Sequence, residues 1–289
     1  MKDSLSLLGG VMAAGMCLGG VAQAQIVAGH YPAGAEGIKA GSLPPPGLYL
    51  RDYSFYYSAD TYKDGPPSFD ISAFINAPRV IWMTDKKVLG ASYGMDVIVP
   101  FGYMDWEVMG SHGHHFGLGD ISVEPLLLSW NLGQFDLAAA YAFWAPTGDF
   151  KVGQPDLISK GYWSHMLTAG GTWHIDDAKT WAFSILNRYE FAHEQKDTHI
   201  DPGQVYTVEW GLSKSVTKTI DVGCVGYYQR QTTLDSSSPL LDRVVGVGPE
   251  VSAFWPGLGL FTSLRWNFEF GAQDRPEGQR VTLTLTKIF

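Results

Sequence analysis

Charged side chains alternate with large apolar ones along several segments of this sequence. In 258–271, Arg265 and Glu269 stand on either side of the pair Trp266 and Phe268. Because successive side chains of a strand point to opposite faces, such charged residues would share one face of each strand. That face could line a path for a solute, or it could form a structural network of Glu–Arg ion pairs, which we favour for any single residue. The polar positions of this kind are Asp96, Glu124, Arg188, Glu190, Glu209, Tyr227, Glu250, Arg265 and Glu269.

Aromatic residues occupy some positions of the same polar face. Tyr227, Trp144 and Phe254 fall on it by parity. They could contact a ring-bearing ligand, or they could pack against another part of the chain.

Histidines gather in the segment 111–117, which reads SHGHHFG. Imidazole is a common ligand of transition metals. However, the spacing brings no carboxylate or cysteine to complete a site, so His112, His114 and His115 are weak metal candidates. A pH-sensitive external loop or plain surface polarity explains them better, and we expect no cofactor.

Catalytic groups are hard to assemble from this sequence. Ser164 and His165 are neighbours in one alternating segment, so they point to opposite faces and cannot meet, and Ser213 has no evident partner. The sequence contains no G-x-S-x-G, H-E-x-x-H or P-loop motif. We therefore do not expect an enzyme, and an outer-membrane hydrolase is the less favoured alternative.

The alternating segments indicate long strands with one apolar face. In 162–175, Trp163, Leu167 and Trp173 share a face opposite Ser164 and Thr172. A tilted strand covers roughly 25 Å of height over ten residues, which matches the apolar band of a membrane-spanning barrel. Soluble sandwiches also alternate, but their strands are shorter, typically about 5–6 residues.

Composition agrees with strands in an apolar solvent. The chain has 289 residues, of which 13% are aromatic and only 17% charged, with 34 glycines. Soluble domains carry roughly 25% charged residues. Abundant aromatic residues exclude a disordered chain, and a net charge of −9 without a basic cluster argues against a nucleic-acid partner.

The segments predict an antiparallel barrel of about twelve strands. Short turns alternate with longer connections at 59–78, 102–117, 147–161, 195–203, 234–242 and 273–278. Outer-membrane barrels alternate short periplasmic turns with longer outer loops, whereas a sandwich has no reason to do so. One short turn is expected at Asp85–Lys87. The expected strands cover 47–58, 79–84, 88–101, 118–130, 134–146, 162–175, 179–194, 204–216, 219–233, 243–256, 258–272 and 279–289.

The two ends of the chain carry different signals. Residues 1–24 read as a secretory signal peptide, with an apolar stretch followed by Ala22-Gln23-Ala24. Residues 25–46 are rich in Pro and Gly and do not alternate, so they form either a plug in the lumen, which we favour, or a periplasmic tail. Residues 47–289 would form the barrel. The final strand ends on Phe289, a signal that the barrel-assembly machinery could read.

Several stretches resemble a known family, the SphA-like outer-membrane proteins described as phenol meta-pathway degradation proteins. Nearly the whole chain after the leader takes part. The resemblance implies an outer-membrane β-barrel of Gram-negative bacteria with a transport role and no catalytic motif. The similar stretches are 29–60, which reads GHYPAGAEGIKAGSLPPPGLYLRDYSFYYSAD, and 117–130, 141–150, 187–204, 245–257 and 268–283.

These observations predict a channel for passive uptake of a small apolar or aromatic compound across the outer membrane. The partners would be outer-membrane lipid, the solute and the assembly machinery. The alternative is a structural or adhesion barrel with a closed lumen.

Overall fold

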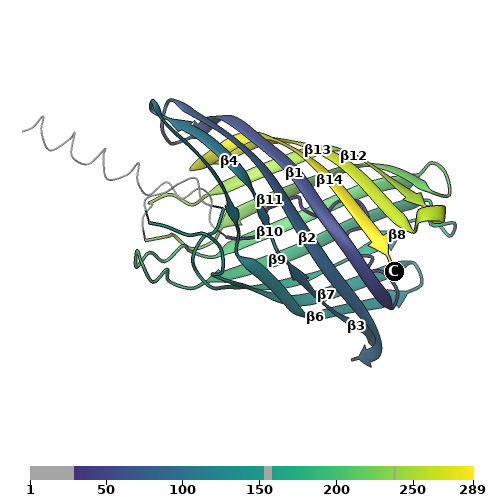
Figure 1. The fold of residues 1–289 in the computed structure, drawn as a ribbon. Coiled ribbons are helices and arrows are strands. Elements are labelled where there is room, and N and C mark those ends of the chain that lie inside the picture. The colour runs from purple at the N-terminus through teal and green to yellow at the C-terminus, as the bar shows by residue number, and fades with distance from the viewer. Residues whose placement is uncertain (1–28, 153–157, 237–238) are drawn as a thin grey trace, which may run out of the picture.

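The chain forms a closed antiparallel β-barrel whose strands tilt across its wall (Figure 1). The computed structural model describes residues 29–152, 158–236 and 239–289, so the predicted signal peptide lies outside the described residues. Among these ranges no helix is long and apolar enough to cross a membrane. The elements are β1 (Gly47–Lys63), β2 (Phe69–Val88), β3 (Ala91–Ile98), β4 (Phe101–Val108), β5 (Ser111–Leu118), β6 (Ile121–Leu132), β7 (Phe135–Ala145), β8 (Ser164–His174), β9 (Trp181–Ala192), β10 (Val205–Ser215), β11 (Ile220–Gln231), β12 (Arg243–Trp255), η2 (Pro256–Leu258), β13 (Leu260–Gln273) and β14 (Arg275–Ile288).

The strand segments form the twelve strands of the barrel wall, as predicted. β2 pairs with β3 along one half of its length and with β4 along the other, so β3 and β4 together form one wall strand with an interruption at Val99 and Pro100. Pro100 has no N–H to donate to the ladder, which accounts for this interruption. Likewise β5 and β6 form one wall strand with an interruption at Gly119 and Asp120. β1 pairs with both β2 and β14 and closes the barrel.

The expected loops at 59–78, 102–117 and 273–278 are wrong, because most of their residues belong to strands. β2 begins at Phe69 and turns Phe69, Ile71 and Ala73 toward the interior, so apolar side chains face inward here and the polar-inward pattern fails. The hairpin β4–β5 turns at Met109–Gly110, and β2–β3 turns at Leu89–Gly90 rather than at the predicted Asp85–Lys87. Both turns have positive φ at both residues, which is the geometry of a two-residue type I′ hairpin.

The two faces of the wall have opposite chemistry. Trp163, Trp266 and Phe270 are 42%, 45% and 49% exposed on the outside. Thr172, Glu209 and other polar residues of the intervening positions are buried inside. A closed barrel with an apolar exterior satisfies its backbone hydrogen bonds within the wall, which a bilayer requires. The C-terminus lies at one end of the barrel, and the long connections after β7, β9 and β11 lie at the other, together with the short turns β4–β5 and β13–β14 (Figure 1).

Candidate functional site

Residues 29–46, called the lumenal segment below, run through the interior of the barrel. Glycines let this segment approach the wall closely. Gly34 has a φ of +78°, and a β-carbon there would overlap Tyr227 and Arg280. A β-carbon on Gly37 would overlap the carboxylate of Glu250 and the guanidinium of Arg265. Position 34 therefore requires glycine, and a larger residue at position 37 would have to displace the side chains of Glu250 and Arg265.

Carboxylates of the barrel wall accept hydrogen bonds from the backbone of the lumenal segment. The N–H groups of this segment have no strand partner, and a buried N–H without an acceptor is costly. Four of them donate to three predicted site residues: His30 (2.7 Å) and Tyr31 (3.1 Å) to Glu190, Glu36 (3.2 Å) to Glu209, and Ile38 (2.8 Å) to Glu250. These acids thus hold the lumenal segment.

Wall donors bind the carbonyl groups of the same segment. Arg265 Nη2 donates to the carbonyl oxygen of Ala35 at 2.6 Å, and Arg280 donates to that of Ala33. Gln229 Nε2 donates to the carbonyl oxygen of Tyr31 at 3.0 Å. The wall therefore satisfies donors and acceptors of the lumenal segment alike.

His30 joins the lumenal segment to two carboxylates. Its Nδ1 lies 3.1 Å from Glu190 Oε1, and its Nε2 lies 3.0 Å from Asp120 Oδ2. Burial opposes protonation, but the hydrogen bonds and charges of Asp120 and Glu190 outweigh it and raise the pKa of His30 above 6.5. Asp120 also accepts from the Ser159 hydroxyl at 2.6 Å, which ties the break between β5 and β6 to the β7–β8 connection.

Ser164 completes an arrangement that resembles a catalytic triad. Its hydroxyl lies 2.9 Å from His30 Nδ1. A general base needs a ring nitrogen with a free lone pair, and both nitrogens of His30 face carboxylates. The Ser164 hydroxyl itself donates to Glu190 at 2.8 Å. The cluster therefore clamps the lumenal segment and does not activate Ser164 as a nucleophile.

Glu36 is the second ionic attachment of the lumenal segment. Its carboxylate lies 3.3 Å from both Arg51 and Arg79 and accepts the Tyr53 hydroxyl at 2.6 Å. Burial alone would raise the pKa of Glu36, but the two arginines outweigh it and lower that pKa to about 2. Arg79 also binds Asp96 at 2.6 Å and Glu124 at 3.1 Å. Arg79 is therefore the centre of this cluster.

Two cavities meet at this cluster. The first, called the aromatic cavity, has a volume of about 320 Å³. The second, called the small cavity, has a volume of about 100 Å³ and lies against the part of the lumenal segment from Glu36 to Pro44. The residues that line both are Glu36, Arg79, Glu124 and Arg188. Ion pairs thus separate two compartments of one lumen.

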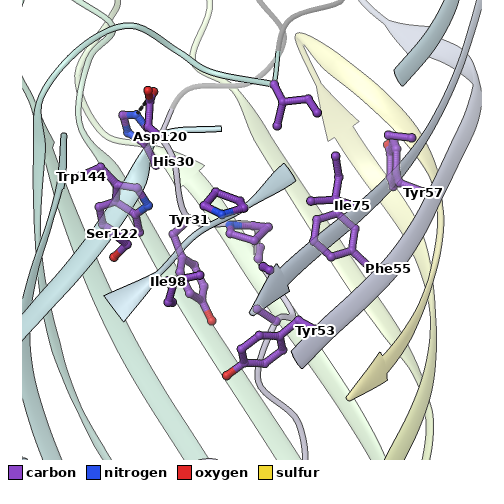
Figure 2. A pocket seen from close by; sticks show the side chains of 18 of the residues that line it. His30, Tyr31, Tyr53, Phe55, Tyr57, Ile75, Ile98, Asp120, Ser122 and Trp144 are labelled. Carbon is purple, nitrogen blue, oxygen red and sulfur yellow. Dashed lines mark hydrogen bonds and ion pairs between the residues drawn. The ribbon is translucent and has the colours of Figure 1, made fainter. Parts of the chain in front are cut away.

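The aromatic cavity has largely apolar walls. Tyr53, Phe55 and Tyr57 project from one face of β1, and Trp144 lies on the other side of the cavity, beside His30 (Figure 2). The sequence reasoning missed the three β1 aromatics. Their i, i+2, i+4 spacing within the expected strand 47–58 was the signal that could have identified them.

The predicted site residues fall into two groups. Asp96, Glu124, Arg188 and Glu269 line the aromatic cavity, as does Trp144. Glu190, Glu209, Glu250 and Arg265 contact the lumenal segment. Tyr227 donates to Glu269 at 2.8 Å and packs against Ala33, whereas Phe254 stacks on Phe261 and lines neither cavity.

Several cations that line the aromatic cavity, such as Arg79 and Arg280, escaped the sequence reasoning. Among the described residues that line the aromatic cavity, His30 apart, five are carboxylates and five carry a positive charge. Arg275, which was not predicted, binds Asp242 at 2.9 Å, and the predicted Arg188 binds Glu209 at 2.6 Å. Positive and negative charges are therefore balanced around the cavity.

The histidine candidates lie on the outer hairpin. His112 and His114 stand opposite Glu107 and Asp105 of β4, and His115 is opposite Met104. In the described part of the chain, no three His, Cys, Asp or Glu side chains are grouped as a metal site.

A closed barrel with an apolar exterior, a polar lumen and long connections at one end defines the class of outer-membrane-type β-barrels. The chain belongs to the family described as "Putative MetA-pathway of phenol degradation", whose model matches residues 54–285. This confirms the resemblance drawn from the sequence. A search of the curated proteins gives no match.

Solved structures share the fold. The COG4313 outer membrane channel from Pseudomonas putida F1 is 14% identical over 90% of this chain and 99% of that one, with a TM-score of 0.75. The β domain of the Bordetella autotransporter BrkA is 11% identical over 85% of this chain and 100% of that one, with a TM-score of 0.52. The translocator domain of NalP from Neisseria meningitidis is 9% identical over 85% and 90%, also with a TM-score of 0.52.

Proposed function

We propose that this protein lets a small, uncharged apolar or aromatic compound pass the outer membrane passively. The single observation that carries the proposal is the aromatic cavity inside the barrel. Its volume of about 320 Å³ lies within the roughly 300–1,000 Å³ of typical ligand pockets. The longer connections would face the outside and the short turns the periplasm.

The charges around the cavity favour an uncharged solute. Arg79, Arg188 and Arg275 are each paired with a carboxylate, and Arg280 donates to the carbonyl oxygen of Ala33. Because most of these cations already have carboxylate partners, a charged solute would lose its hydration and gain few counter-ions, which costs several kcal/mol. An apolar or ring-bearing solute instead gains contact with Tyr53, Phe55 and Tyr57.

The lumenal segment would control the passage. Its Glu36 bridges Arg51 and Arg79 between the two cavities, so a solute in the aromatic cavity cannot advance until this cluster separates. The same attachments favour a second candidate, a structural or adhesion barrel whose lumen stays closed. The two candidates differ in whether any solute crosses.

Filling the aromatic cavity is expected to abolish uptake. Ala73 lines this cavity, so Ala73→Phe would place a ring in the space the solute needs. The measurement is influx of a phenol-sized aromatic into liposomes that contain the purified protein, with a sugar as the polar reference. The matched control is Ala139→Phe on the outer face of β7, which adds the same ring away from the lumen. Equal influx in both variants would contradict the proposal, and no influx with the wild-type protein would favour the closed barrel.

Alkaline pH is expected to loosen the lumenal segment. His30 has a pKa raised above 6.5, so its ion pairs stabilise docking fully below about pH 6.5 and are lost as pH rises through the raised value. Influx of the aromatic solute should therefore increase as the pH rises from about 6.5 through the raised pKa of His30. His30→Gln should show the higher influx already at the lower pH and no rise. A pH response that His30→Gln leaves unchanged would assign it to another group.

A further inference from the structure

Two arginines face each other on the outer surface of the barrel. Arg230 near the end of β11 and Arg243 at the start of β12 are direct cross-strand partners, and both side chains are exposed. Side chains so paired have their β-carbons about 4.5–5.5 Å apart, and like charges directly opposite each other destabilise a sheet.

Nothing in the described part of the chain compensates this repulsion. Neither guanidinium makes an ion pair or hydrogen bond with a residue of 29–152, 158–236 or 239–289. Most arginines of the lumen, such as Arg275 with Asp242 and Arg188 with Glu209, do have carboxylate partners. The outer pair therefore has a charge arrangement suited to an anion from outside the chain.

The surroundings of the pair indicate what kind of anion that is. Tyr206 of β10 pairs with Arg230, and Gln273 of β13 pairs with Arg243, so four adjacent strands contribute polar side chains at one level. Next to the pair, on the side away from the β11–β12 connection, the outer wall becomes apolar. Tyr228, Val245 and the exposed Phe270 lie there. A ligand with a phosphate head group and apolar chains matches this arrangement, in which a charged and polar region adjoins an apolar one.

We infer that Arg230 and Arg243 together bind a phosphate group of lipid A, the phosphorylated glycolipid of the outer leaflet. The inference rests on the proposed orientation, in which the ends of β11 and β12 at this level face outward. Each guanidinium can offer two N–H groups to phosphate oxygens, and the fork geometry suits arginine better than lysine. The phosphate neutralises the repulsion, and the acyl chains cover the apolar wall beneath it.

Other anions fit the surface less well. A free phosphate ion would neutralise the pair but would leave the apolar wall without a partner. Nucleic acids and acidic proteins bring no acyl chains that would cover the apolar wall. The combination of a cationic pair and adjoining apolar surface therefore favours the lipid.

Native mass spectrometry of the full-length protein in detergent tests this binding. The probes are bisphosphorylated lipid A, dephosphorylated lipid A and inorganic phosphate, each added separately. The wild-type protein should retain bisphosphorylated lipid A, and Arg230→Gln with Arg243→Gln should weaken retention by roughly 100-fold. Lys214→Gln is the matched control, since Lys214 lies over Trp181 at the opposite end of the outer wall. Equal retention of phosphorylated and dephosphorylated lipid A, or retention of inorganic phosphate alone, would overturn the inference.

Thermal unfolding gives an independent test, because the difference in unfolding temperature between the wild-type protein and the double variant should reverse when anionic lipid is added. Without anionic lipid, the double variant removes like-charge repulsion, so it should unfold at the same or a higher temperature than the wild-type protein. With bisphosphorylated lipid A, the wild-type protein should become the more stable of the two. A variant that is less stable under both conditions would show a purely structural role. Solute influx through the double variant should be unchanged, so failure here is distinguishable from failure of the proposed channel.

Discussion

Glutamine in place of Glu36 is expected to release the lumenal segment and open a continuous path through the barrel. The substitution keeps the side-chain shape but leaves Arg51 and Arg79 without the carboxylate that lies 3.3 Å from each. Removing one partner of a buried pair costs about 3 kcal/mol, which changes the ratio of docked to released segments by roughly 100-fold. Single-channel conductance in a planar bilayer should show longer and more frequent open events.

A partly exposed glutamate, Glu277, provides the control for this experiment. Glu277 pairs with Lys63, whose side chain is 42% exposed, and it lines neither cavity. Glu277→Gln changes the net charge by the same amount and should leave the conductance as in the wild-type protein. If Glu36→Gln conducts no more than Glu277→Gln, Glu36 does not hold the segment closed.

Methionine in place of Arg79 is expected to cause the largest loss of stability. Arg79 contacts Glu36, Asp96 and Glu124 at 3.3, 2.6 and 3.1 Å, so its removal leaves three carboxylates close together without a shared cation. Breaking a buried network in this way costs roughly 3–5 kcal/mol. Urea unfolding, followed by the shift in gel mobility of the folded barrel, measures the change.

Two further variants, one at Arg51 and one that adds a compensating change at Glu124, test whether the loss of stability is specific to Arg79. Arg51 pairs with Glu36 and its side chain is 24% exposed, so Arg51→Met should cost much less than Arg79→Met. Adding Glu124→Gln to Arg79→Met removes one stranded charge and should restore part of the stability. An equal cost for both arginines, or no restoration, would show that Arg79 is not the centre of the network.

Alternation in the sequence was enough to predict the barrel and its two faces. Trp266 and Arg265 are neighbours whose opposite environments, one exposed and one buried, follow from strand geometry alone. The number of twelve wall strands follows from counting segments that alternate in this way. The prediction failed where this pattern reverses. Phe69 and Ile71 turn apolar side chains into the lumen, so the first part of β2 did not look like a wall strand.

The candidate site was only partly accessible from the sequence. Glu190 and Glu209 could be placed on the lumen side by parity, but their partners in the lumenal segment could not. His30 and Glu36 lie in a stretch without periodicity, and their contacts join residues 160 and 43 positions away, such as Glu190 and Arg79. No local pattern encodes contacts of that length, because they depend on closure of the whole barrel.

The path of the lumenal segment has a consequence for how the protein reaches its native state. Residues translated early in the chain depend on partners translated late: Ile38 bonds Glu250 across 212 positions, and Ala35 bonds Arg265 across 230. Contacts at such separation form slowly, since a long loop must be closed before they contribute. During biogenesis, therefore, the segment cannot complete its attachments until β9–β14 have come together, and the sealing of the lumen is among the final events of maturation.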